Sequence, residues 1–315
     1  MKLKQLLIGA CMAFTAAVVS AQDISFGIIS TDAASAQRDR WEPFFRDMEK
    51  QTGLKVKSFY ATDYAGVIEA MRFNKIQVAW YGNKAAMEAV DRANGEIFAQ
   101  LMYADGSFGY HALLITHKDS PYKTLEDVIK NGKNIHFGIG DPNSTSGFLV
   151  PTYYIFSQQK LDPRQVFKTV RNGSHGANIQ AVLAKQLDVA TNNTEDMGRL
   201  QSTKPELYSQ LRVLWTSPLI PSDPFVWRKD LDPAVKEKIR TFVLNYAKNS
   251  EEEKAVLKNI YNYAGFRASN NDQLKPIRQL ELFKERTKIE TAQNMNASEK
   301  QAKLAEIDQA LAALK

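Results

Sequence analysis

Short apolar runs with the character of β-strands alternate with amphipathic helical stretches along most of this 315-residue chain. The first strand pattern covers residues 24–30, and the helical pattern after it ends at Gly53. Further strand patterns over residues 54–60 and 76–80 flank a helical pattern over residues 63–73. Alternation of this kind is typical of α/β proteins, in which helices cover the faces of a largely parallel sheet. The chain is therefore predicted to be an α/β protein.

A second series of the same kind starts near Asn134 and includes strand patterns at residues 166–170 and 187–191. It is followed by the proline-rich stretch "SPLIPSDPFVW" at 217–227, which is interpreted as an extended connection, neither strand nor helix. We therefore predict two α/β lobes, with the chain crossing out near residues 110–117 and back through the proline-rich stretch. The predicted boundaries are 22–112 and 218–270 for lobe 1, 113–217 for lobe 2 and 271–315 for a helical C-terminal tail.

The tail differs in kind from the lobes, because from residue 273 onward it is charged and helical. Ser298 and Gln301 have the spacing of a capping box at the start of its last helix. That helix carries an apolar stripe at 3-4-3 spacing, formed by Leu304, Ile307, Leu311 and Leu314. A helix packed on its own protein is the favoured interpretation, and a homodimer formed through the C-terminal helices is the alternative.

The N-terminus has the three-part form of a secretory signal peptide. Lys2 and Lys4 precede a mostly apolar run over residues 6–19, and small residues follow, with cleavage expected after Ala21. The run of about 14 residues is shorter than the roughly 20 that a membrane-spanning helix needs. A lipoprotein cleavage box ending at Cys11, the only cysteine, is the alternative. The chain is therefore expected to be exported.

The charge distribution and the spacing of the histidines indicate which partners and cofactors to expect. The formal charge of +6 is spread along the chain without a block of basic residues, so nucleic acid is not an expected partner. The four histidines, His111, His117, His136 and His175, lack the spacing of metal ligands. Neither a metal nor a cofactor is therefore expected.

The stretch "GDPNSTSGFLVP" at residues 140–151 places four polar residues between a strand pattern and a helical pattern. It lacks the third glycine of a dinucleotide fingerprint, the Gly-Lys-Ser/Thr of a P-loop and the Gly-x-Ser-x-Gly of a serine hydrolase. The parts of an enzyme are therefore missing. Since one side chain is enough to cap a helix, the surplus hydroxyls need another explanation.

A helix start rich in hydroxyls is suited to binding an anion. The first N–H groups of a helix have no internal partner and carry about half a positive charge. The hydroxyls of Ser144, Thr145 and Ser146 can turn toward an oxyanion, and Gly147 is expected to let a ligand approach closely. The motif thus favours a tetrahedral anion. A redundant helix cap is the alternative that the motif alone leaves open.

Other polar residues also follow predicted strands, namely Tyr64, Tyr81, His175, Glu195 and Asp223. Because the carboxyl ends of strands form the ligand crevice of open α/β sheets, these residues are candidates for one site, with Tyr81 as a cleft residue. Each also has an ordinary structural interpretation, as a tyrosine at the edge of the core, an acid in a first helical turn or a turn residue before a proline.

With these residues in view, the chain resembles the periplasmic phosphonate-binding proteins of ABC-type phosphonate transporters over nearly its whole mature length. The stretches that carry the resemblance are "FGIIST", "DYAG", "MRFNK", "AWYGN", "AMEAVDRANG", "ADGS", "GDPNSTSGFLVP", "DVATNNTE", "SPLIP", "DPFVWRK" and "PIRQLELFKE". The resemblance implies a type II solute-binding fold, with two lobes and two hinge crossings that close on a ligand. It also implies a periplasmic location, a membrane permease as partner and no enzymatic activity.

The resemblance further implies roles for single residues. The residues expected at the phosphonate are Ser144, Thr145, Ser146, Tyr64, Tyr110 and His175. In members that take 2-aminoethylphosphonate, two carboxylates hold the ammonium group, and the matching positions are Glu195 and Asp223. Around His175 the sequence "GSHGAN" departs from the His-Glu-Thr-Asn of close members.

The two acids also restrict the ligand on physical grounds. A carboxylate beside an anion site repels the ligand unless the ligand also carries a positive charge. Glu195 and Asp223 therefore favour a zwitterion such as 2-aminoethylphosphonate. The alternatives are phosphite, phosphate or an alkylphosphonate on the same scaffold, a secreted phosphoester hydrolase, and a second role as the partner of a sensory receptor.

Overall fold

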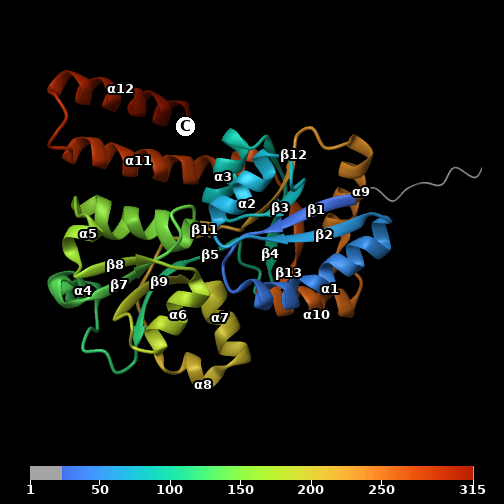
Figure 1. Cartoon of the computed structure of the whole chain (residues 1–315), viewed down its shortest axis with the longest axis horizontal. Helices are drawn as coiled ribbons and strands as arrows, with labels where there is room; N and C mark the ends of the chain where they lie inside the picture. The colour runs from blue at the N-terminus through green and yellow to red at the C-terminus, as the bar shows by residue number, and fades with distance from the viewer. Residues whose placement is uncertain (1–22, 315) are drawn as a thin grey trace, which may run out of the picture.

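A computed structural model describes residues 23–314 (Figure 1), so the predicted signal peptide lies outside the described residues. Two β-sheets with helices on their faces form two lobes, and a helical tail follows them. The predicted α/β class is confirmed. Among the described residues, no helix combines the length and the apolar character that a membrane-spanning segment needs.

Lobe 1 is built on a six-stranded sheet with the strand order β13-β4-β12-β3-β1-β2. Its strands are β1 (Asp23–Ile28), β2 (Lys55–Tyr60), β3 (Val78–Trp80), β4 (Gly95–Tyr103), β12 (Pro224–Arg228) and β13 (Tyr263–Ala268). Its helices are α1 (Ala34–Thr52), α2 (Tyr64–Arg72), α3 (Asn83–Arg92), α9 (Pro233–Asn245) and α10 (Glu251–Tyr261). As predicted, α1 ends at Gly53, whose φ of 70° suits a residue without a Cβ.

Lobe 2 is built on a five-stranded sheet with the order β10-β6-β9-β7-β8. Its strands are β6 (Ala112–His117), β7 (His136–Ile139), β8 (Thr169–Asn172), β9 (Val189–Asn193) and β10 (Leu211–Thr216). Its α-helices are α4 (Leu125–Lys130), α5 (Pro163–Val166), α6 (His175–Leu183), α7 (Thr194–Thr203) and α8 (Pro205–Tyr208). Two π-helical segments, η2 (Thr145–Leu149) and η3 (Thr152–Phe156), and two 3-10 turns, η1 (Gly132–Asn134) and η4 (Ser157–Gln159), complete it.

A two-stranded ribbon connects the lobes. It consists of β5 (Gly109–Tyr110) and β11 (Ile220–Pro221), which pair antiparallel. Figure 1 shows this ribbon between the two sheets. Both crossings of the chain thus run side by side, which is the arrangement of a hinge.

The interpretation of residues 217–227 as a connection throughout is wrong for its second half. Residues Pro224 to Arg228 form β12, which lies inside the sheet of lobe 1 between β3 and β4. Pro224 is the first residue of the strand, where a missing N–H is tolerated. The apolar residues that follow it then pack in the core, and this burial outweighs the local signal of the prolines.

Among the smaller shifts of element boundaries, two have a clear local cause. The strand predicted at 166–170 is displaced to Thr169–Asn172, because Asp162 caps the short helix α5 with Pro163 as its first residue. The last helix starts after Asn296, whose side chain accepts the N–H of Glu299, so the Ser298 capping box is not formed. In both places an earlier Asp or Asn supplies the cap.

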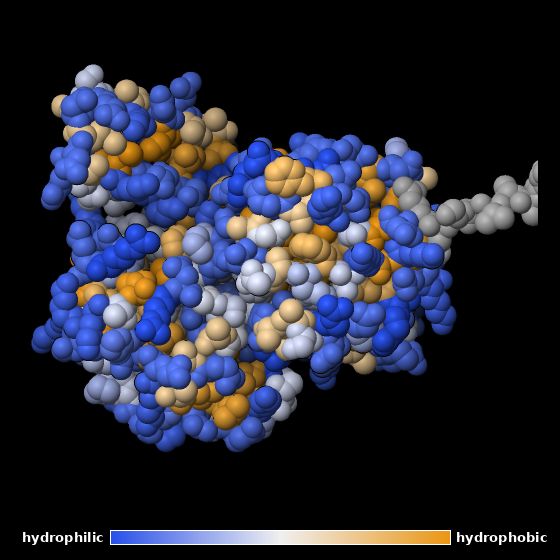
Figure 2. Space-filling model, viewed as in Figure 1, coloured by the Kyte–Doolittle hydropathy of each residue, from blue (hydrophilic) through white to orange (hydrophobic). Residues whose placement is uncertain are grey.

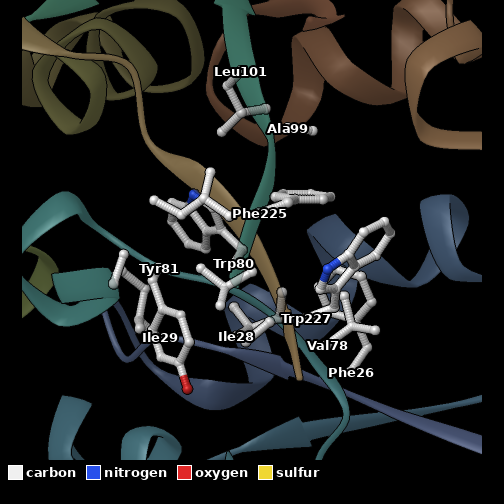
Figure 3. Packing of buried hydrophobic residues seen from close by; sticks show 14 of the residues in the cluster. Phe26, Ile28, Ile29, Val78, Trp80, Tyr81, Ala99, Leu101, Phe225 and Trp227 are labelled. Atoms are coloured by element: carbon white, nitrogen blue, oxygen red, sulfur yellow. The ribbon is translucent and has the colours of Figure 1, made fainter. Parts of the chain in front are cut away.

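Aromatic and aliphatic side chains from several strands pack together in the core of lobe 1 (Figure 3). The ring of Phe225 in β12 lies 5.4 Å from that of Phe26 in β1, edge to face. The indole of Trp227 stacks on Phe98 at 4.0 Å. Since all four side chains are buried, β12 is fixed firmly in the sheet. Asp223, the residue directly before β12, is thereby held in place.

The tail begins with a 3-10 turn, η5 (Asn271–Leu274), and continues as two helices, α11 (Lys275–Thr291) and α12 (Ala297–Ala313). They lie side by side in Figure 1, joined by an ion pair between Arg286 and Asp308 at 2.9 Å. The predicted apolar stripe of α12 is half-buried, and Figure 2 shows apolar side chains along the seam between the two helices. The helix therefore packs on its own chain, as the favoured interpretation expected.

Candidate functional site

The "GDPNSTSGFLVP" stretch forms a helix start at the end of β7. Ser144 is the N-cap of η2, and its Oγ accepts the N–H of Gly147 at 3.0 Å. The segment is π-helical, a form found frequently at functional sites. Gly140 and Gly147 are in such close contact that a Cβ on Gly140 would lie 2.5 Å from the Cα of Gly147. The two glycines therefore let the helix start directly against the strand.

Two of the three hydroxyls of this helix start lie beside a buried histidine at the start of α6. His175 Nε2 lies 3.4 Å from both Ser144 Oγ and Ser146 Oγ, and Asn193 Nδ2 donates to Ser146 Oγ at 3.3 Å. Burial lowers the pKa of His175, which favours the neutral ring. Its Nδ1 has no hydrogen-bond partner among the described residues. The structure thus brings together all four of these predicted residues, counting Thr145, which lies between the two serines.

The role expected for Gly147 is wrong. A Cβ at this position would lie 3.0 Å from the His175 ring and 2.9 Å from Ser144 Oγ. The space left by the missing side chain is therefore occupied by the protein itself. Gly147 permits the packing of the site and does not give access to it.

Helix starts from lobe 1 meet this cluster directly. The N–H of Lys84, in the first turn of α3, donates to Thr145 Oγ1 at 2.8 Å. The N–H of Tyr64, the first residue of α2, donates to Asp141 Oδ2 at 3.2 Å. Burial raises the pKa of the Tyr64 hydroxyl well above its usual value, so it stays a donor. The starts of α2 and α3, which carry partial positive charge, therefore contact the segment that holds the three hydroxyls across the boundary between the lobes.

Two buried carboxylates lie beside the helix starts, one from each lobe. Glu195 Oε1 accepts hydrogen bonds of 2.8 Å from the hydroxyls of Tyr103 and Tyr263. Asp223 Oδ1 accepts from the Tyr110 hydroxyl at 3.0 Å and from Asn83 Nδ2 at 3.3 Å. The second oxygen of each carboxylate receives no hydrogen bond from residues 23–314. Each acid therefore keeps one oxygen available to a further donor.

Burial disfavours the charged form of both carboxylates. It raises the pKa of Glu195 to about 7 and that of Asp223 well above its usual value, and the charge of Glu195 raises the latter further. The two acids are 9% and 3% exposed. A buried negative charge needs a positive partner. An ammonium group that donates to both acids would supply one.

Gly82 shows how near the hydroxyl cluster and the carboxylates are. A Cβ on Gly82 would lie 3.3 Å from Thr145 Oγ1 and 3.9 Å from both carboxylate oxygens of Asp223. The helix start at Thr145 and this acid therefore both lie next to Gly82, which has no side chain to separate them. A molecule of a few atoms, negative at one end and positive at the other, matches this arrangement.

Two of the predicted tyrosines have contacts that their sequence positions did not suggest. The hydroxyl of Tyr110, expected at the phosphonate, donates to Asp223 on the carboxylate side. The hydroxyl of Tyr81, expected in the cleft, donates to the carbonyl of Val67 at 2.9 Å within lobe 1. Tyr81 is fully buried and belongs to the core cluster in this arrangement.

An interlobe ion-pair network, formed by Asp32, Arg40, Asp196 and Arg199, flanks the site and was missed from sequence. Asp32 Oδ2 in lobe 1 lies 3.1 Å from Arg40 Nη1 and 3.2 Å from Arg199 Nη2 of lobe 2. Arg199 also lies 3.6 Å from Asp196, and the Tyr261 hydroxyl donates to Asp196 at 3.4 Å. A single charged residue in a sequence does not indicate which distant charge it will pair with. Their convergence depends on how the lobes meet.

Comparison with known proteins gives the family. Residues 26–274 match the family model of the periplasmic substrate-binding protein of phosphonate ABC transporters. The chain is 52% identical to the phosphonates-binding periplasmic protein of Escherichia coli K12, over 90% of this chain and 83% of that protein. It is 27% identical to the phosphate-import protein PhnD of Mycolicibacterium smegmatis, over 78% of this chain and 83% of that protein.

A solved structure agrees with this assignment. The binding-protein component of an ABC phosphonate transporter from Pseudomonas aeruginosa superposes with a TM-score of 0.91 at 54% identity, over 94% of this chain and 97% of that one. The two-sheet fold resembles that of type II solute-binding proteins, as predicted. The chain belongs to the family of periplasmic phosphonate-binding proteins of ABC transporters, whose members bind and deliver a substrate without converting it.

Proposed function

We propose that the phosphonate bound by this chain carries a positively charged amino group, with 2-aminoethylphosphonate as the leading ligand. One observation carries the proposal: two buried carboxylates, Glu195 and Asp223, each keep one oxygen without a hydrogen bond from the described residues. They lie beside the helix start at Ser144, whose hydroxyl and N–H groups suit an anion. Phosphate and phosphite offer them nothing positive, so these ligands would leave the acids uncompensated.

The proposed contacts follow the two ends of the ligand. Ser144, Thr145, Ser146, the Tyr64 hydroxyl and His175 bind the phosphonate oxygens, helped by the helix starts. Glu195 and Asp223 accept hydrogen bonds from the ammonium group. The Tyr110 hydroxyl holds Asp223, and we propose that it also contacts the phosphonate. Tyr81 has an indirect role, in which its packing in the core supports the lobe 1 side of the site.

The proposed delivery cycle uses the hinge. Residues 22–112 with 218–270 form one moving body and residues 113–217 the other, with the β5–β11 ribbon between them and the tail 271–315 on the outside. Contacts from both lobes to one ligand favour the closed state. The closed protein then docks on the inner-membrane permease of its transporter, after export to the periplasm and cleavage after Ala21.

The tail is proposed as the contact between two copies of the chain. No residue of α12 is fully buried, although its apolar stripe is sheltered on one side by α11. A second hairpin packed on the first would cover the remainder. Light scattering on the exported chain and on a version ending at Thr291 tests this: loss of a dimer on truncation supports it, and a monomer in both cases contradicts it.

Titration calorimetry tests the ligand. We expect 2-aminoethylphosphonate to bind more tightly than methylphosphonate, phosphate and phosphite. Equal or tighter binding of methylphosphonate would show that the carboxylates do not select an amino group. Tighter binding of phosphate would instead favour the activity named for the relative that is 27% identical. In that case the chain would serve phosphate import.

A further inference from the structure

The carboxylate of Glu195 is held by a pair of tyrosines from the opposite lobe. The hydroxyls of Tyr103 and Tyr263 each lie 2.8 Å from Glu195 Oε1. Tyr103 ends β4 and Tyr263 starts β13 in lobe 1, whereas Glu195 is the second residue of α7 in lobe 2. Both tyrosine side chains are buried. Neither residue was singled out by the sequence or by the ligand contacts proposed above.

The sheet register explains why both hydroxyls reach one oxygen. Tyr103 and Tyr263 are direct partners in the antiparallel pairing of β4 with β13. Directly opposed side chains lie on the same face of the sheet, and these two rings are 5.5 Å apart. The hydroxyls therefore form a two-donor fork that is fixed within lobe 1.

The fork has a directional effect on Glu195. Two donors on Oε1 fix the plane of the carboxylate and leave Oε2 as the oxygen without a hydrogen bond from the described residues. Burial raises the pKa of both tyrosines well above their usual value, so each hydroxyl keeps its proton and remains a donor. Their hydrogen bonds lower the pKa of Glu195 and so oppose the effect of its burial. The fork thus favours a charged, oriented carboxylate.

We propose that Tyr103 and Tyr263 are specificity-determining positioning residues, which place Glu195 to receive the amino group of the ligand only when the lobes are closed. The inference rests on the proposed function, because it concerns the ammonium end of the ligand. Selection of the amino group is then coupled to closure, since the open protein separates the acid from its two donors. The fork contributes nothing to the phosphonate end, where it makes no contact.

Single and double Tyr→Phe variants test the proposal by calorimetry with two ligands. Tyr103→Phe and Tyr263→Phe should each lower the affinity for 2-aminoethylphosphonate about ten-fold or more, as expected for a lost hydrogen bond to a charged group. The affinity for methylphosphonate should fall less, because this ligand loses only the contact that the tyrosines make between the lobes, and its remaining binding shows that the variants still fold and close. The ratio of the two affinities is thus the measured quantity. An unchanged ratio in the double variant overturns the proposal.

Tyr246→Phe is the matched control. It removes another tyrosine hydroxyl of lobe 1, which donates to Asp47 Oδ2 over a distance of 2.6 Å. Neither Tyr246 nor Asp47 belongs to the proposed site. It should leave the affinity ratio unchanged, whatever its effect on stability. A fall in the ratio in this control as large as in the fork variants would overturn the assignment of selectivity to the fork.

The pH profile separates positioning from a merely structural role. Without the two donors, the pKa of Glu195 rises, so binding of 2-aminoethylphosphonate should weaken at a higher pH in the double variant than in the unaltered protein. The other ionisable groups that face Glu195 are Asp196, Asp223 and Tyr110. They are identical in both proteins. An unshifted profile would overturn the proposal.

The same titrations distinguish failure of the inference from failure of the proposed function. If the unaltered protein does not prefer 2-aminoethylphosphonate to methylphosphonate, the proposed function fails, and the inference fails with it. If the unaltered protein shows the preference and the fork variants keep it, only the inference fails.

Discussion

The backbone N–H of Lys84 and the hydroxyl of Thr145 belong to different lobes and are joined by a hydrogen bond of 2.8 Å. Both groups are buried. Thr145 is also one of the three hydroxyl residues at the helix start that the sequence marks as an anion site. A single side chain therefore joins the two lobes and also belongs to the proposed anion site.

Thr145→Val should weaken binding of every phosphonate. The substitution keeps the shape of the side chain but leaves the buried N–H of Lys84 without its acceptor, at a cost of about 1–3 kcal/mol. We expect the affinities for 2-aminoethylphosphonate and methylphosphonate to fall in parallel, by roughly ten-fold or more. Thr145→Ser, which keeps the hydroxyl, is the control. A loss confined to the amino ligand in calorimetry would contradict a role at the anion end.

Glu195→Gln should remove a pH dependence. Burial raises the pKa of Glu195 to about 7 in the ligand-free site, so this acid takes up a proton as the pH falls from 8 to 6. The unaltered protein should therefore bind 2-aminoethylphosphonate more weakly at pH 6 than at pH 8. In the variant this part of the dependence is absent. The titration of the ligand itself is common to both proteins and cancels in the comparison, so parallel profiles would rule out Glu195 as the titrating group.

The order of the elements and the helix start that carries the proposed anion site could be predicted from sequence, because both depend on local patterns. Ser144 caps a helix directly after a strand, and that signal lies within a few residues. The pairing of Tyr103 with Tyr263 could not be predicted from sequence, because these residues are far apart in the chain and meet only through the register of β4 and β13. The strand β12 was missed for the opposite reason, because prolines around it gave a strong local signal that burial in the sheet overrides.

Asp32→Asn should weaken all ligands by the same factor. Asp32 pairs with Arg40 of its own lobe and with Arg199 of the other, and it makes no proposed contact with the ligand. Loss of this pair shifts the balance toward the open state, which lowers every apparent affinity equally. We expect a reduction of roughly three- to ten-fold, because the Asp32 and Arg199 side chains are partly exposed and therefore screened.

Glu69→Gln is the matched control for Asp32→Asn. Glu69 pairs with Arg72 and Arg92, both in lobe 1, so the same loss of charge leaves the contact between the lobes intact. Its affinities should be unchanged. A change in the ratio of 2-aminoethylphosphonate to methylphosphonate affinity in Asp32→Asn would place Asp32 at the ligand and contradict the assignment to closure.

Asp223→Asn should stabilise the ligand-free protein at alkaline pH. Burial, and then the charge of Glu195, raise the folded-state pKa of Asp223 well above its unfolded value. The stability linked to this proton is fully present below the unfolded pKa, near pH 4, and is lost as the pH rises through the folded pKa. Asparagine has no such loss and can still accept from Tyr110 and Asn83 through its carbonyl oxygen.

The unfolding temperature of Asp223→Asn should therefore exceed that of the unaltered protein at pH 8, and the difference should vanish toward pH 4. Asp196→Asn is the opposite case, because this buried carboxylate faces Arg199 at 3.6 Å, and its loss should lower the unfolding temperature at pH 8. Adding 2-aminoethylphosphonate at pH 8 should raise the unfolding temperature of the unaltered protein above that of Asp223→Asn, because only the carboxylate of Asp223 gains a positive partner. If the ligand raised both unfolding temperatures equally, Asp223 would have no share in binding the amino group, and its burial would have to be explained by the hinge alone.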